Sequence, residues 1–308
     1  MSYVGPGFEP PQPRRSPLRR PVAVALALVV VGGPAGWFVW QAVADDGDGR
    51  VMYSGGYEPL SPTLSPDDPA DLATTPASSA GPLAGKVVVV DPGHNPGNFQ
   101  HSADINRKVN IGTNWKECDT TGTATNDGYT EAEFTLDVAR RLRTVLEQQG
   151  ATVKFTQDGD ESARPFGPCV DERARIGNAA HADAVVSIHA DGSGAGNRGF
   201  HVILPGAVHD GAADTRPIVG PSRLLGERVK DGFVRETGSA PSNYIGGGTG
   251  LDTRTDLGGL NLSTVPKVFI ECGNMRDGKD AALLTSGVWR QKAALGISEG
   301  IVSFLRES

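Results

Sequence analysis

Short apolar runs alternate with amphipathic segments along the chain from about residue 85 onward. Four valines precede Asp-Pro-Gly-His in the run that ends at His94, and comparable runs end at His189 and at Glu271. Uninterrupted apolar runs of this length are typical of strands that are buried on both faces of a parallel sheet. Two further strands are predicted over residues 151–156 and 199–204.

Between these runs, apolar residues recur at helical spacing. The clearest helix starts after Thr130 and ends at Gly150, and Thr130 and Glu133 have the spacing of a capping box. Further helices are predicted over residues 170–180, 221–237 and 288–305. We interpret the Gly-rich, polar stretch over 242–266 as the lining of a groove. The alternation predicts a single α/β domain over residues 85–308, with a mainly parallel central sheet flanked by helices on both faces.

Three segments of different composition precede this domain. Residues 1–20 contain four arginines, and residues 21–43 contain no charged side chain. Such an apolar segment can cross a hydrocarbon core of about 30 Å, and the arginines predict that its amino end stays in the cytoplasm. Ala42-Val43-Ala44 also fits a signal-peptide cleavage site. The domain is therefore expected outside the cytoplasm, either anchored in the membrane or secreted, after a flexible, disordered Pro/Ser/Thr-rich linker at 44–84.

The charge balance argues against one class of partner. The net charge is −7, and since the first 44 residues carry +3, the remainder carries −10. Proteins that bind nucleic acid present basic patches to the phosphates, so no nucleic-acid partner is expected.

The three cysteines suit an exported domain with one disulfide and one free thiol. Cys118 and Cys169 stand in polar segments flanked by Gly or Pro, whereas Cys272 directly follows an apolar strand. We predict that Cys118 pairs with Cys169 and that Cys272 stays reduced and buried.

Residues that can bind a metal stand at the ends of the predicted strands. The carboxyl ends of parallel strands meet at one edge of a sheet, so His94, His189 and Glu271 are expected to lie close together. Glu131 stands seven residues before Val138, about two helical turns, and should face the core, where a carboxylate needs a partner. His94, Glu131 and His189 would form a catalytic zinc site with one open position.

Glu271 is the candidate for the proton transfers. Zinc lowers the pKa of bound water to about 7, and a nearby carboxylate must then accept the proton. The alternative is that Glu271 forms a structural ion pair with Arg254 or Arg276. Asp91 is a candidate to orient His94, as carboxylates commonly do for metal-bound histidines.

Four motifs in this order resemble a known enzyme family. VVVDPGH, the helix start at Glu131, SIHAD and IECGNM are similar to motifs of the zinc-dependent N-acetylmuramoyl-L-alanine amidases of the Amidase_3 type, especially actinobacterial members. The resemblance implies one Zn²⁺ held by His94, Glu131 and His189, with Glu271 as the catalytic glutamate. It also implies peptidoglycan or muropeptides as substrate, cut between N-acetylmuramic acid and L-alanine.

Several points stay open. Arg254 and Asn261 are candidate contacts to the stem peptide. A zinc peptidase that acts within the stem peptide would use the same site, and a catalytically silent protein of the same fold could bind the cell wall or regulate other enzymes. The long polar segment at 95–128 could cover the site until an activator protein moves it.

Overall fold

The computed structural model describes residues 81–160 and 162–307. The basic segment, the predicted membrane-spanning segment and nearly all of the predicted linker lie outside the described residues. Within the described residues, no helix combines the length and the apolar character needed to cross a membrane. Leu83, which the sequence assigned to the linker, is fully buried in the core, so the folded part begins slightly earlier than predicted.

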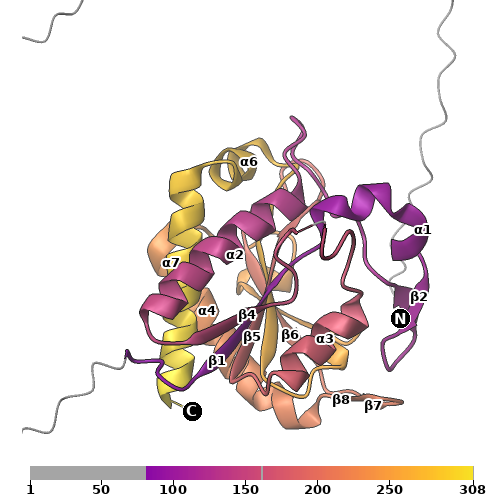
Figure 1. Ribbon diagram of the computed structural model, residues 1–308. Helices are drawn as coiled ribbons and strands as arrows, with labels where there is room; N and C mark the ends of the chain where they lie inside the picture. The colour runs from indigo at the N-terminus through magenta and orange to yellow at the C-terminus, as the bar shows by residue number, and fades with distance from the viewer. Residues whose placement is uncertain (1–80, 161, 308) are drawn as a thin grey trace, which may run out of the picture. The chain divides into compact units, whose positions relative to one another are not determined.

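A six-stranded sheet forms the centre of the domain (Figure 1). Its order is β4-β1-β5-β10-β6-β9, in which β4, β1, β5 and β10 are parallel, β6 is antiparallel to β10, and β9 is parallel to β6. The sheet is therefore mainly parallel, as predicted. The strands are β1 (Val87–Pro92), β4 (Thr152–Phe155), β5 (Ala184–Asp191), β6 (His201–Pro205), β9 (Leu251–Arg254) and β10 (Lys267–Asn274).

Helices cover both faces of the sheet, as predicted (Figure 1). Alternate apolar residues of β1, β5, β6 and β10 pack in one main core with the helices of the first face. Those helices are α2 (Glu131–Gln148), α4 (Arg216–Thr237) and α7 (Gly287–Glu307), and the short α6 (Gly278–Leu284) adjoins them. The opposite face carries α3 (Val170–Ala179) and the short α5 (Gly258–Asn261).

Two predictions about element boundaries were wrong. Helix α4 begins at Arg216, and Pro221, which the sequence suggested as its start, lies inside it. Proline suits the first turn of a helix, but that place is taken by Pro217. The stretch at 242–266, in which the sequence predicted no helix or strand, contains the short 3₁₀ helix η2 (Gly246–Gly248), strand β9 and helix α5. Strand β9 reads LDTR, and as a polar edge strand it has no apolar run to reveal it.

The polar segment at 95–128 has its own secondary structure. It contains the 3₁₀ helix η1 (Pro96–Gln100), helix α1 (Ser102–Ile105) and a hairpin of β2 (Lys108–Asn110) and β3 (Trp115–Glu117). A second hairpin pairs β7 (His209–Asp210) with β8 (Ala213–Asp214).

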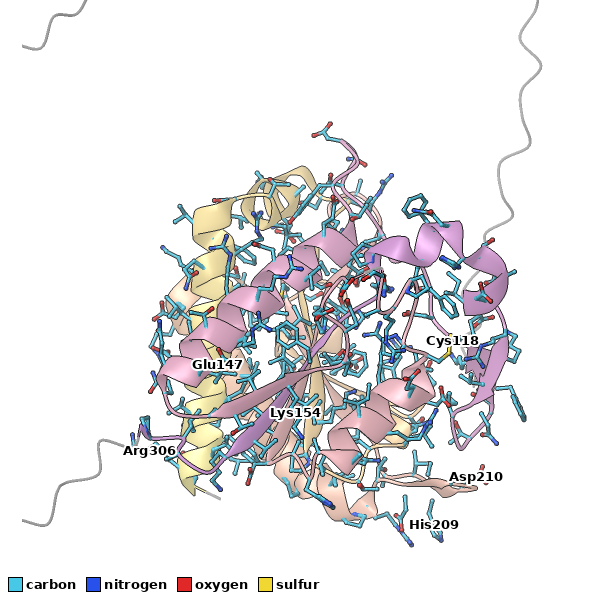
Figure 2. All side chains as sticks on the ribbon, in the orientation of Figure 1. Cys118, Glu147, Lys154, His209, Asp210 and Arg306 are labelled. Atoms are coloured by element: carbon cyan, nitrogen blue, oxygen red, sulfur yellow. A yellow bond between two sulfur atoms is a disulfide. The ribbon has the colours of Figure 1, made fainter. Side chains whose placement is uncertain are left out.

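The predicted disulfide between Cys118 and Cys169 is confirmed, and it joins the segment 95–128 to the start of α3 (Figure 2). Both cysteines are buried in a small apolar cluster with Val109 and Ile111. Cys272 is free and buried, also as predicted. The segment is therefore held by its own core and by a covalent bond, so it is not a long irregular loop.

Candidate active site

His94 follows the end of β1 and presents its two ring nitrogens to different groups. Its backbone φ is 63°, a conformation that residues other than glycine rarely adopt. Nδ1 lies 3.0 Å from the carbonyl oxygen of Thr120 and donates to it, since a carbonyl oxygen can only accept. Nε2 is left free for a metal ion, and it lies 3.0 Å from Oε1 of Glu131.

Glu131 is the first residue of α2 and is buried, as its predicted position on the inward face requires. The predicted capping box of Thr130 and Glu133 is confirmed, so the helix start is capped without Glu131. The backbone N–H of Thr123 donates to Oε2 of Glu131 over 2.9 Å. This bond leaves Oε1 facing the two imidazoles.

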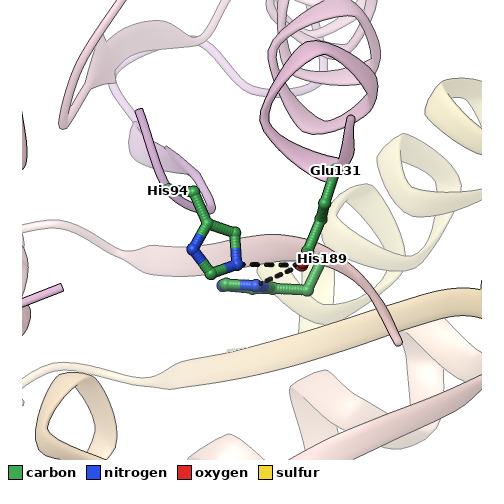
Figure 3. Close-up of side chains that lie close together, drawn as sticks. All are labelled: His94, Glu131 and His189. Carbon is green, nitrogen blue, oxygen red and sulfur yellow. Dashed lines mark hydrogen bonds and ion pairs between the residues drawn. The ribbon is translucent and has the colours of Figure 1, made fainter. Parts of the chain in front are cut away.

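His189 lies in β5 and completes a cluster of the three residues that the sequence proposes as ligands. Its ring stacks on Phe269 with the centroids 5.1 Å apart, and its Nδ1 lies 3.0 Å from Oε1 of Glu131. The candidate ligand atoms of His94, Glu131 and His189 all lie within 4.8 Å of one another (Figure 3). With metal–ligand bonds of about 2.0–2.1 Å, tetrahedral geometry places ligand atoms roughly 3.3 Å apart. The spacing of the three side chains therefore fits a tetrahedral metal ion such as zinc.

The charges of the cluster favour a cation between its members. Burial lowers the pKa of His94, but Glu131 and Asp119 raise it more strongly, so that it lies well above its usual value. Burial raises the pKa of Glu131, but His94 and His189 outweigh this and hold it far below its usual value. The ionised carboxylate of Glu131 therefore attracts positive charge to the space between the two imidazoles.

Glu271 in β10 lies beside His189, its partner in the parallel pairing with β5. Its Oε2 is buried and has no hydrogen-bond partner within the described residues. Burial raises the pKa of Glu271 well above its usual range, and the charges of Glu131 and Asp191 raise it further. An unpaired carboxylate next to three candidate metal ligands is suited to accepting and releasing a proton.

The alternative role of Glu271, a structural ion pair, is absent from the part of the chain that the structure describes. Arg254 pairs with Asp256 instead, at 2.8 Å. Arg276 donates to the carbonyl oxygen of Ala124.

Two adjoining cavities meet at the cluster. The first has a volume of about 410 Å³ and is lined by all three cluster residues together with Glu271 and Arg254. The second, of about 260 Å³, shares His94 and His189 with the first and extends toward Lys116 of the β2–β3 hairpin. The first volume lies within the range of about 300–1,000 Å³ that is common for ligand clefts, and the second cavity adds space beside it.

The two residues suggested as contacts to a stem peptide are placed differently. Arg254 lines the first cavity, where its guanidinium can meet a ligand. Asn261 lines neither cavity: it is buried, and its amide donates to the carbonyl oxygen of Thr255 and to the hydroxyl of Thr113. The side chain of Asn261 is therefore held within the fold and not in the cavities beside the cluster.

The prediction that Asp91 orients His94 was wrong. The Asp91 carboxylate is fully buried and contacts Arg173 at 2.7 Å and Lys267 at 3.0 Å. The acidic residue that faces Nδ1 of His94 is Asp119, whose Oδ1 lies 3.6 Å away. The position of Asp91 near the end of β1 could not reveal its partners, because they come from distant parts of the chain and meet its side chain inside the protein.

Sequence reasoning missed the residues that contact His94 from outside the cluster, among them the charged pair Asp119 and Arg173. Asp119 follows Cys118, and Arg173 stands four residues after Cys169. Because the predicted disulfide joins Cys118 to Cys169, it could have indicated that Asp119 and Arg173 lie close together. The helical spacing puts Arg173 on the same face as Val170 and Ile176, and the exposed Arg175 on the opposite face, so the periodicity was a signal for the buried arginine.

Comparison with known proteins gives a consistent result. The chain matches the model of the Amidase_3 family, described as N-acetylmuramoyl-L-alanine amidase, over residues 88–303. It is 40% identical over 237 residues to an N-acetylmuramoyl-L-alanine amidase of Mycobacterium tuberculosis, which covers 77% of this chain and 91% of the relative.

Two solved structures of mycobacterial amidases are also similar. The amidase Ami1 of Mycobacterium smegmatis is 41% identical with a TM-score of 0.66, over 73% of this chain and 99% of that protein. Ami1 of Mycobacterium abscessus, in its apo form, is 40% identical with a TM-score of 0.64, over 72% of this chain and all of that one. The motif resemblance is thus confirmed, and the chain belongs to the N-acetylmuramoyl-L-alanine amidase family of the Amidase_3 type.

Proposed function

We propose that this protein is a zinc-dependent peptidoglycan hydrolase that cleaves the amide bond between N-acetylmuramic acid and the L-alanine of the stem peptide. The observation that carries the proposal is the convergence of His94, Glu131 and His189 beside the unpaired carboxylate of Glu271. Membership of the amidase family supports the substrate class. Peptidoglycan or muropeptides are the proposed partners.

Each residue of the site has a separate task in this proposal. His94, His189 and Glu131 would hold the zinc ion, with Nε2 of His94 and Nδ1 of His189 both facing Oε1 of Glu131. Bound zinc supplies a Lewis acid that polarises the scissile carbonyl and makes water easier to deprotonate. Glu271 takes the proton from the attacking water and delivers it to the departing L-alanine nitrogen. Arg254, in the same cavity, is placed to contact carbonyl or carboxylate groups of the stem peptide.

The proposed site of action is outside the cytoplasm. The support comes from the sequence, in which four arginines precede the uncharged segment at 21–43 and a Pro/Ser/Thr-rich stretch follows. We propose that this segment either anchors the domain in the membrane, facing the cell wall, or is cleaved so that the domain is secreted.

The test is mass spectrometry of muropeptides incubated with the protein, with and without a zinc chelator. The proposal predicts release of intact stem peptides with a free L-alanine amino terminus, abolished by chelator and restored by zinc. Shortened stems that stay attached to muramic acid would indicate a zinc peptidase instead. Absence of any product from zinc-loaded protein would favour a silent cell-wall-binding or regulatory protein.

A further inference from the structure

A buried arginine is linked to both the backbone and the imidazole ring of the candidate ligand His94. Arg173 on α3 is 5% exposed, and its Nη2 donates to the backbone carbonyl oxygen of His94 over 2.9 Å. The same Nη2 donates to Oδ2 of Asp119 over 3.0 Å. The other carboxylate oxygen, Oδ1, lies 3.6 Å from Nδ1 of the His94 imidazole. Arg173 therefore touches the backbone of His94 directly and its ring through Asp119.

The backbone contact matters because His94 is in a conformation that needs support. A non-glycine residue rarely adopts a φ near +60°, and such strained backbone persists only where its surroundings hold it in place. The carbonyl oxygen of His94 is held by Arg173 and also by the side-chain amide of Gln157, over 3.0 Å. These two hydrogen bonds hold the peptide group that joins His94 to Asn95.

The ring contact determines which nitrogen is available. The carbonyl oxygen of Thr120 accepts from Nδ1, and the carboxylate of Asp119 adds a negative charge on the same side. Hydrogen-bond acceptors at one imidazole nitrogen fix the tautomer and raise the basicity of the other nitrogen as a ligand. For His94 the nitrogen freed in this way is Nε2, which faces Glu131.

Arg173 is itself held in place from several directions. Its Nη1 donates to Oδ1 of Asp91 and to the carbonyl oxygen of Pro92, each over 2.7 Å, and its Nε donates to the carbonyl oxygen of Pro168 over 2.9 Å. A guanidinium is suited to this because its donors spread in a fixed plane, which a lysine ammonium cannot reproduce.

We propose that Arg173 and Asp119 are positioning residues, which hold His94 so that its Nε2 is presented to the zinc ion. Asp91 contributes only through Arg173. The inference rests on the proposed zinc-dependent function. It explains how His94 is held in its orientation by two residues that are not themselves metal ligands.

The test measures the zinc dissociation constant by competition with a chromophoric chelator, in the full-length protein. Asp119→Asn keeps the shape of the side chain and removes its charge, and Arg173→Lys keeps a cation but not the planar set of donors. Loss of an outer partner of a metal-bound histidine typically weakens metal binding about 10–100-fold, and we expect this for both variants. The matched control is Glu172→Gln on the same helix, which breaks a partly exposed ion pair with Arg164 and should leave zinc affinity unchanged.

Thermal unfolding of the metal-free proteins separates positioning from a purely structural role. Asp119→Asn should remain folded without zinc and still bind zinc more weakly, so it decides the matter if Arg173→Lys does not fold. If Asp119→Asn binds zinc as tightly as the wild type, the positioning inference is overturned but the proposed function is not. Failure of the wild-type protein to bind zinc would overturn the proposed function as well.

Discussion

The carboxylate of Asp91 is buried between two cations, Lys267 and Arg173, both of which are almost fully buried themselves. Burial raises the pKa of Asp91, but Lys267 and Arg173 outweigh it and hold the pKa far below its usual value. A carboxylate with a lowered pKa in the folded protein stabilises it above the unfolded pKa of about 3.9, and this stabilisation is lost as the pH falls further.

Asp91→Asn should therefore change stability in a pH-dependent way. At pH 7 the variant leaves the buried Lys267 without its anion, whereas Arg173 keeps Asp119 as a partner. Removing one partner of a buried pair costs about 3–5 kcal/mol. Between pH 4 and pH 2 the variant should lose less stability than the wild type, because it lacks this titrating group. Urea unfolding at a series of pH values measures both effects.

Asp210→Asn is the control, since Asp210 is exposed in the β7–β8 hairpin (Figure 2). It should change the free energy of unfolding by less than about 0.5 kcal/mol at any pH. An Asp91→Asn variant with the stability and pH dependence of the wild type would contradict the assignment of Asp91 to a buried charge network.

Helices α4 and α7 pack with their backbones in direct contact. A Cβ atom added to Gly232 of α4 would lie 2.3 Å from the carbonyl oxygen of Gly296 in α7, and one added to Gly300 would lie 2.4 Å from Cα of Val229. These distances leave no room for a side chain, so the glycines set how closely the two helices approach.

Gly232→Ala should separate these helices and destabilise the protein by about 1–3 kcal/mol, the usual cost of overpacking. Gly220→Ala in the same helix is the matched control, because a Cβ there meets no atom within 4 Å. It should stabilise the protein by up to about 1 kcal/mol, since alanine favours a helix over glycine. Denaturant unfolding measures both, and equal effects would contradict the close packing of α4 on α7.

Among the helices and strands, those with a clear apolar run or a clear helical periodicity were predicted from the sequence. The valine run of β1 and the amphipathic α2 with its capping box belong to this group. Strand β9 was missed because it is a short polar edge strand, and its pairing with β6 is a contact between distant segments. The hairpin of β2 and β3 was missed because its few apolar residues pack in a small separate cluster with the two bonded cysteines, which the pattern along the chain does not reveal.

For the molecule as a whole, the position of the site followed from one topological rule. Parallel strands bring their carboxyl ends to one edge, and His94, His189 and Glu271 were predicted to meet on that basis. The supporting partners Asp119 and Arg173 could not be found in this way, because their roles depend on which side chains the folded chain buries together.

The central claim is that Glu271 performs the proton transfers at a zinc ion held by three other residues. It is tested most directly by Glu271→Gln, which keeps the size of the side chain and removes its capacity as a base. The variant and the wild type are compared for bound zinc per chain and for the rate of stem-peptide release from muropeptides. We predict equal zinc content and a rate at least about 100-fold lower in the variant. A zinc-loaded variant that cleaves within a few-fold of the wild-type rate would contradict the account.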